Sequence, residues 1–142
     1  MRFVLPAEKK LVHEMTVPIR WGDMDAMGHV NNTLYFRYLE VVRLDWYFRV
    51  AAAHGITALS GEGVIIVNAF CNFIRQFEFP GEVRARMYTA EVGRSSFDTF
   101  LTMERTDLPG VVHAEGGATT VWTDFAAKKS RPMPDWLRAI VS

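Results

Sequence analysis

The stretch TLYFRYLEVVRLDWYFRVAAA, residues 33–53, decides the fold, because its pattern is helical and it is apolar on nearly every side. Its charged residues are few, namely Arg37, Glu40, Arg43, Asp45 and Arg49. A helix that is apolar nearly all round is buried on most of its sides in a folded protein. The rest of the chain is therefore expected to wrap around this segment.

The segments on either side of this helix have the pattern of strands joined by short turns. HEMTVPIRW (13–21) alternates apolar residues and contains Pro18, which favours an edge strand or a bulge. After the helix, strand candidates span residues 63–79, 83–92, 97–106 and 111–125, and the last contains the glycine pair 116–117. Paired glycines in a strand indicate a bulge or a close backbone approach. Because the turns PGE, GRSS and DLPG are short enough for hairpins, the chain is predicted to be α+β, an antiparallel sheet wrapped around one long central helix.

Length and composition describe a single globular domain over residues 1–142. The formal net charge is zero, which removes any global electrostatic argument for binding nucleic acid or an anionic membrane. The one cysteine, Cys71, excludes an intramolecular disulfide and fits a buried apolar position. We see no secretory signal and no run of about 18 apolar residues, so we expect a cytoplasmic protein that does not span a membrane.

Two further expectations concern metals and assembly. His13 and Glu14 begin an H-E-x-x-H zinc motif, but position 17 is valine, and the remaining histidines are scattered. We therefore expect no metal site. A sheet curled around one helix leaves an unprotected edge, which a second copy can cover, so a homodimer or homotetramer is expected.

Polar residues gather directly before the helix in GDMDAMGHVNN, residues 22–32. The start of a helix offers free backbone N–H groups and the positive end of the dipole, which can stabilise an oxyanion. Asp25 precedes this point by seven residues, and Gly28 allows the chain to turn tightly. A carboxylate beside an oxyanion site can attack an activated acyl carbonyl directly or through water. Aspartate and asparagine here also fit an ordinary turn and helix cap, so the residues alone leave both interpretations open.

The run IRWGDMDAMGHVNNTLYFRYLEVVR (19–43) resembles the start of hot-dog-fold proteins of the 4-hydroxybenzoyl-CoA thioesterase type. Those proteins share a strand ending in D-x-D, a glycine, often H-V-N-N, and then a tyrosine-rich helix. The hairpin GEVRARMYTAEVGRSSFDTFLTME (81–104) and the tail DFAAKKSRPMP (124–134) are similar to later parts of the same family. The likeness covers nearly the whole chain and implies the hot-dog fold, a sheet wrapped around a long helix.

The resemblance also implies a reaction and a site. It implies hydrolysis of an acyl-coenzyme A thioester at a dimer interface, with no cofactor, since coenzyme A is part of the substrate. Asp25 matches the catalytic carboxylate, acting as nucleophile or general base, and the backbone N–H near Asn32 matches the group that polarises the carbonyl. His29 and Asn31 match motif residues that shape the site, and Asp23 matches a structural position.

Substrate-binding side chains are indicated more loosely. Tyr35 and Tyr38 on the helix are candidates for the acyl pocket. Cationic and hydroxyl side chains are expected along the path of the coenzyme A phosphates. The candidates at the hairpin turn and in the tail are Arg94, Ser95, Ser96, Lys128, Lys129 and Arg131. A thioesterase acting on acyl-carrier protein and a noncatalytic acyl-CoA-binding module are the alternatives, because a fold does not determine a function.

Overall fold

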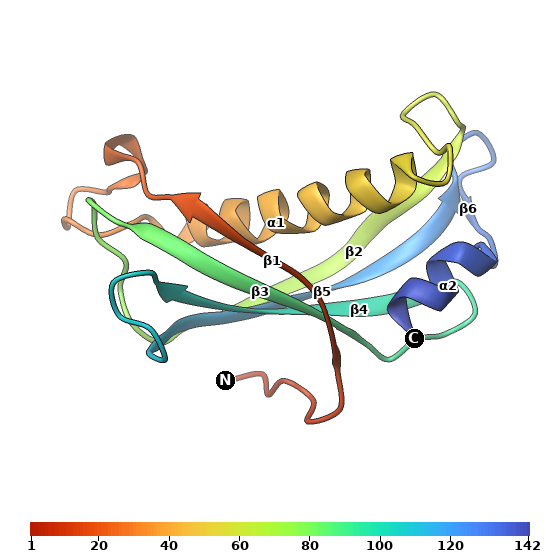
Figure 1. The fold of residues 1–142 in the computed structure, drawn as a ribbon. Coiled ribbons are helices and arrows are strands. Elements are labelled where there is room, and N and C mark those ends of the chain that lie inside the picture. Colours follow the sequence, from red (N-terminus) through yellow and green to blue (C-terminus); the bar gives the residue numbers. More distant parts are fainter.

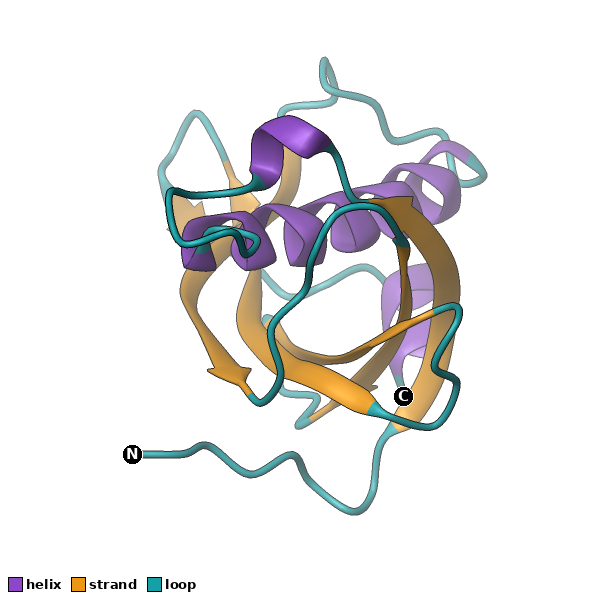
Figure 2. Cartoon of the chain, turned by 90° about the vertical axis from the view of Figure 1, so that its left-hand side faces the viewer, coloured by secondary structure: helices purple, strands orange, loops and turns teal.

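The computed structural model describes residues 1–142 and has one antiparallel sheet that curves along a central helix (Figure 1). The elements in chain order are β1 (Lys10–Pro18), the 3₁₀ turn η1 (Trp21–Asp23), α1 (Asn32–Ala52), β2 (Glu62–Phe73), β3 (Glu82–Ala90), β4 (Ser96–Arg105), β5 (Val112–Asp124), β6 (Lys129–Ser130) and α2 (Asp135–Val141). The sheet order is β1-β3-β4-β5-β2, with β6 paired to β5. Figure 2 shows the strands curving around one side of α1. This is the predicted hot-dog fold.

Helix α1 packs directly onto the middle of the sheet. Its buried side chains are Tyr35, Tyr38, Leu39, Val42, Trp46, Tyr47 and Ala51. A Cβ atom added to Gly116 would lie 2.5 Å from a methyl carbon of Leu39, and one added to Gly117 would lie 2.6 Å from the Phe70 ring. The close approach predicted for the glycine pair is therefore confirmed, because a side chain at 116 would meet the helix and one at 117 would meet the Phe70 ring of the neighbouring strand β2.

The predicted burial of α1 on most of its sides is wrong for a single chain. Phe36, Val41, Leu44 and Phe48 of α1 remain exposed, and 57% of Phe48 is accessible. The sheet covers only part of the helix surface, so these apolar side chains are incompletely covered within this chain. No helix of the structure is both long and apolar enough to cross a lipid bilayer.

Strand β1 ends earlier than the sequence pattern predicted. It stops at Pro18, and Trp21 lies in the turn η1 with 77% of its surface exposed. Proline has no N–H to donate to a ladder, which is consistent with its place at the end of an edge strand. Ile19 is still buried, because the chain continues along the core before it turns.

Strand β2 is also shorter than predicted, and ends at Phe73 rather than at Phe79. The N–H of Arg75 bonds to the carbonyl of His113 at 2.8 Å, and beyond this point the ladder stops. The chain then turns Phe77 into the core, where it is fully buried and stacks on the His113 ring at 4.8 Å. The segment after β2 therefore packs beneath the start of α1 instead of extending the sheet.

The sheet has two edges, β1 and β2, and β2 is the more apolar of them at its exposed positions. Ile65, Ile66, Val67 and Phe73 of β2 are between 41% and 56% exposed. A long strand with apolar side chains and unpaired backbone groups is a template for pairing with another chain. This edge is thus available to a second copy.

Candidate active site

The polar segment before α1 folds into a tight turn that holds Asp25. Its Oδ1 accepts the N–H of Met27 at 2.9 Å and, at a longer 3.5 Å, the N–H of His29. The Asp25 N–H donates to the His29 carbonyl at 2.8 Å, and Gly28 adopts a φ of 82° that suits glycine. One carboxylate oxygen therefore fixes the side chain, while Oδ2 has no hydrogen-bond partner in the chain.

Asp23 has a different role from Asp25. Its Oδ2 accepts the hydroxyl of Tyr38 at 2.7 Å and the N–H of Arg20 at 3.0 Å. Burial, and then the hydrogen bond to Asp23, raise the pKa of Tyr38 well above its usual value. These bonds make Asp23 a structural residue. Tyr38 lines a separate hollow of about 300 Å³ between β1 and α1, and not the cavity beside Asp25.

The first residue of α1 has a free backbone N–H. The Asn31 side chain is the N-cap: its Oδ1 accepts the N–H of Thr33 at 2.9 Å and the Thr33 hydroxyl at 2.8 Å. The Asn32 N–H has no partner within the chain. Because it lies at the positive end of the helix dipole, it can donate to an anionic oxygen. Asn31 is committed to the cap.

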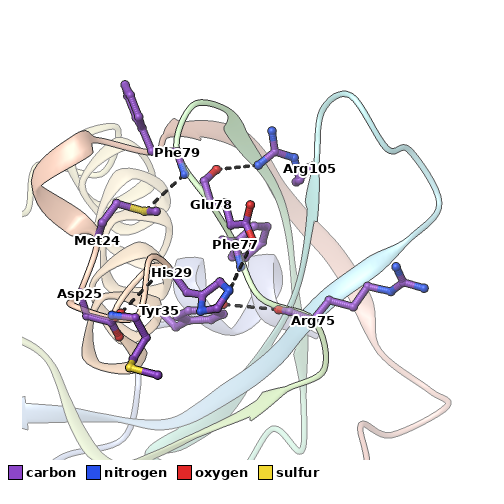
Figure 3. A network of polar contacts seen from close by, with 10 residues as sticks. Met24, Asp25, His29, Tyr35, Arg75, Phe77, Glu78, Phe79 and Arg105 are labelled. Carbon is purple, nitrogen blue, oxygen red and sulfur yellow. Dashed lines mark hydrogen bonds and ion pairs between the residues drawn. The ribbon is translucent and has the colours of Figure 1, made fainter.

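Asp25 and the start of α1 meet around a cavity of about 290 Å³. The lining includes Asp25, His29, Asn32, Tyr35, Phe73 and Gln76. Figure 3 shows Asp25, His29 and Tyr35 gathered beside the segment that follows β2. Asp25 also lines a second hollow, together with Trp21 and Phe79. Of the predicted site residues, the structure brings Asp25, His29, Asn32 and Tyr35 to one cavity.

Tyr35 ties the helix to the segment after β2. Its hydroxyl accepts the N–H of Phe77 at 2.9 Å and donates to the Arg75 carbonyl at 3.4 Å (Figure 3). The Val30 N–H bonds to the Phe77 carbonyl at 2.8 Å. Burial raises the pKa of Tyr35, so the hydroxyl stays neutral. Tyr35 therefore lines the cavity and also holds the segment after β2 in place beside it.

Three residues of the site were missed by the sequence analysis. Phe73 and Gln76 line the cavity, and Glu78 Oε1 lies 3.4 Å from His29 Nε2. The prediction of one strand up to Phe79 placed all three in the sheet. The signal that could have corrected it is the polar run of Arg75, Gln76 and Glu78, which interrupts the apolar pattern.

The predicted phosphate-binding residues belong to elements at the opposite end of the sheet from the turn that precedes α1 (Figure 1). They are Arg94, Ser95 and Ser96 at the β3–β4 turn, and Lys128, Lys129 and Arg131 around β6. Arg131 pairs with Asp124 at 2.7 Å. The structure thus does not bring these side chains to the Asp25 cavity of the same chain.

The geometry suits chemistry at an acyl carbonyl. A carboxylate with one free oxygen and an unpaired helix N–H line the same cavity. The first can attack or deprotonate, and the second can stabilise the negative charge that develops on the carbonyl oxygen. No cluster of three or more His, Cys, Asp or Glu side chains that could hold a metal ion is present.

Several solved structures share this architecture. PA2801 from Pseudomonas aeruginosa, a candidate thioesterase, matches with a TM-score of 0.85 and 32% identity, over 94% of this chain and 100% of that chain. A candidate acyl-CoA thioesterase from Xanthomonas campestris matches with a TM-score of 0.76 and 25% identity, over 87% of this chain and 100% of that chain. The gentisyl-coenzyme A thioesterase BH1999 shares the fold, with a TM-score of 0.77 and 22% identity. The match covers 92% of this chain and 100% of that chain.

Sequence comparison agrees with the structural one. YsmA of Bacillus subtilis, an uncharacterised protein, is 26% identical over 117 residues, which cover 76% of this chain and 78% of that protein. These matches do not distinguish the 4-hydroxybenzoyl-CoA type from other thioesterases of this fold. The family model described as the thioesterase-like superfamily matches residues 19–141, which is nearly the whole chain. The chain therefore belongs to the thioesterase-like superfamily.

Proposed function

We propose that this protein hydrolyses an acyl-coenzyme A thioester to a free carboxylic acid and coenzyme A. The observation that carries the proposal is the shared cavity of Asp25, with its free Oδ2, and the unpaired N–H of Asn32. Membership of the thioesterase-like superfamily and the likeness to a candidate acyl-CoA thioesterase support the same reaction.

In the proposed reaction, the thioester carbonyl oxygen accepts the Asn32 N–H, and the helix dipole stabilises the charge that develops there. Asp25 then acts in one of two ways. As a nucleophile it forms an acyl anhydride, which water hydrolyses; as a general base it takes a proton from water, and the hydroxide adds to the carbonyl. In both cases the carbon–sulfur bond breaks, the thiolate of coenzyme A leaves and takes up a proton, and the acid remains.

The other predicted residues act around this pair. His29, whose ring lies beside Glu78, and Tyr35 shape the walls of the cavity. Asn31 acts through the helix, because its side chain holds the first turn in which the Asn32 N–H is left free. We propose Asn31 as a positioning residue, since it does not line the cavity.

We propose that a second copy completes the site. Antiparallel pairing of two β2 edges about a two-fold axis places the Phe73 end of one copy beside the Glu62 end of its partner. Arg131 Nε lies 3.9 Å from Glu62 Oε1, and Lys129 is on β6 at the same end of the sheet. The cations of one copy would thereby approach the Asp25 cavity of the other.

In this dimer the coenzyme A phosphates would meet cations from the opposite end of the sheet. The side chains proposed for this role are Arg94, Ser95, Ser96, Lys128, Lys129 and Arg131. A tetramer would in addition cover the exposed apolar side chains of α1, which the sheet of one chain covers incompletely.

The proposal predicts that Asp25→Asn lowers kcat/KM by about a hundredfold or more, the scale of one catalytic group. A panel of short, long, branched and aromatic acyl-CoA substrates, with detection of the released thiol, measures this. Asp135→Asn is the matched control, because Asp135 is exposed on α2 at the other end of the molecule. Circular dichroism melts check that both variants fold.

Equal rates for Asp25→Asn and wild type would reject the role of Asp25. An absence of turnover over the whole panel, with retained binding of acyl-CoA, would instead favour a noncatalytic binding module. Hydrolysis of acyl-carrier-protein thioesters, without hydrolysis of acyl-CoA, would show that the substrate is a carrier-protein thioester.

A further inference from the structure

Arg43, in the middle of α1, is the one partly buried arginine of this chain that makes no hydrogen bond or ion pair. Its Nη1 is fully enclosed and has no partner. Arginine stays protonated inside proteins, so an enclosed guanidinium nitrogen without an acceptor is destabilising. Glu40, one turn earlier, pairs with Arg37 at 3.4 Å instead. The chain itself therefore leaves this buried nitrogen without an acceptor.

A hollow of about 110 Å³ lies at this guanidinium, between α1 and the sheet. Arg43, Trp46 and Tyr47 line it from the helix, and Thr99 of β4 and Thr120 of β5 line it from the sheet. Thr120 is only 3% exposed, and its hydroxyl also has no hydrogen-bond partner. Two unpaired polar groups from different elements thus meet at one small cavity, which is unusual because buried polar groups are nearly always hydrogen-bonded.

The chemistry of this hollow matches a carboxylate. A guanidinium donates to carboxylate oxygens in a fixed fork, and a threonine hydroxyl can donate one more hydrogen bond. A hollow of about 110 Å³ holds several water molecules, so it has room for a carboxylate and a short length of hydrocarbon. Trp46, Tyr47 and Val64 supply apolar surface for that hydrocarbon. Glu40 also lines the hollow and opposes an anion, but its pairing with Arg37 reduces this effect.

The hollow is placed in line with the Asp25 cavity. Arg43 follows Asn32 by eleven residues, which is close to three helical turns, so both lie on the same side of α1. At 1.5 Å per residue, the two positions are about 16 Å apart along the helix axis. Phe36 lies between them and contacts the ring of Phe73, with ring centroids 6.4 Å apart. The free N–H of Asn32 and the unpaired guanidinium therefore lie along the same side of the helix.

We propose that Arg43 and Thr120 bind a carboxylate at the far end of the acyl group, so that the preferred substrates are coenzyme A thioesters of dicarboxylic acids. The proposal rests on the proposed thioesterase function. It explains why a charged side chain is kept in the middle of a largely apolar helix, where the protein offers it no partner.

Matched pairs of straight-chain acyl-CoA substrates test this proposal, one member ending in a methyl group and the other in a carboxylate. Wild type is expected to favour the carboxylate-ended member by about tenfold or more in kcat/KM, the effect of a charge-assisted hydrogen bond. Arg43→Gln should remove this preference and leave the methyl-ended substrate unchanged. Thr120→Val should weaken it in the same direction, and serves if Arg43→Gln does not fold.

Two further variants separate the proposal from a general charge effect. Arg49→Gln is the control, because Arg49 is on the same helix, 72% of its side chain is exposed, and it pairs with Asp45, which does not line the hollow. It should leave the preference unchanged. Glu40→Gln should increase the preference, since it removes a like charge from the wall of the hollow.

Calorimetric titration with free dicarboxylic and monocarboxylic acids provides a readout that needs no turnover. Tighter binding of the dicarboxylic acid by wild type and not by Arg43→Gln supports the site, even if hydrolysis itself is absent. An equal response of both substrate types to Arg43→Gln would overturn the proposal. So would dissociation of a wild-type dimer by Arg43→Gln, because the guanidinium would then belong to a contact between copies.

Discussion

Asp23 and Asp25 are two positions apart in the chain, but their carboxylates make different hydrogen bonds. Asp23 Oδ2 receives both the Tyr38 hydroxyl and the Arg20 N–H, so it stabilises the turn and has little capacity for chemistry. Asp25 uses Oδ1 for the turn and keeps Oδ2 free beside a cavity. At the scale of single residues, function depends on which hydrogen-bonding positions the fold leaves unoccupied.

Cys71 is expected to be unreactive in the folded protein. Burial raises the pKa of its thiol to about 12, so at pH 8 only about one molecule in ten thousand carries the reactive thiolate. Alkylation followed by mass spectrometry should show little labelling of the native protein and complete labelling in guanidinium chloride. Rapid labelling of the native protein would contradict this burial. Slow labelling also means that Cys71 does not disturb an assay that detects released coenzyme A.

At the scale of elements, α1 depends on its first turn. Asn31→Ala should lower the free energy of unfolding by about 1 kcal/mol, because the N–H of Thr33 loses its acceptor. Asn31→Ser should retain most of the stability, since serine is also a good cap. Urea unfolding measures both. Where the variant is folded, hydrolysis should stay within severalfold of wild type, and a loss as large as that of Asp25→Asn would instead assign Asn31 to the catalytic group.

Strand β2 shows why the ends of elements were hard to predict. Its apolar pattern continues past Phe73, and a period of two cannot show where a ladder loses its partner. The end is decided by β5, whose His113 carbonyl accepts the N–H groups of both Ile74 and Arg75. It is also decided by Tyr35, whose hydroxyl binds Phe77 from the helix.

At the scale of the whole molecule, the exposed apolar β2 edge predicts a dimer with shared sites. Sedimentation should show a dimer or tetramer, and a monomer alone would contradict the pairing. A mixing experiment tests the sharing. Asp25→Asn and the double variant Lys128→Ala, Lys129→Ala should each be impaired alone, and mixed dimers should regain activity. One of their two sites then combines an intact Asp25 with intact cations of the partner.

Sites built within one chain would give a different result. The mixed dimers would then hold no site with both an intact Asp25 and intact lysines, and mixing would restore nothing. Wild type mixed with Asp25→Asn is the control for subunit exchange.

The sequence by itself determined the fold class, the long central helix and the position of Asp25 before the helix start. These follow from local patterns, namely the period of apolar residues, turn residues, cap residues and a family motif. Only the tertiary structure decided the end of β2, the exposed apolar side chains of α1, the separation of the cations from Asp25 and the unpaired Arg43. Each of these depends on contacts between residues far apart in the chain, and no local pattern of side chains encodes which distant partner a residue meets.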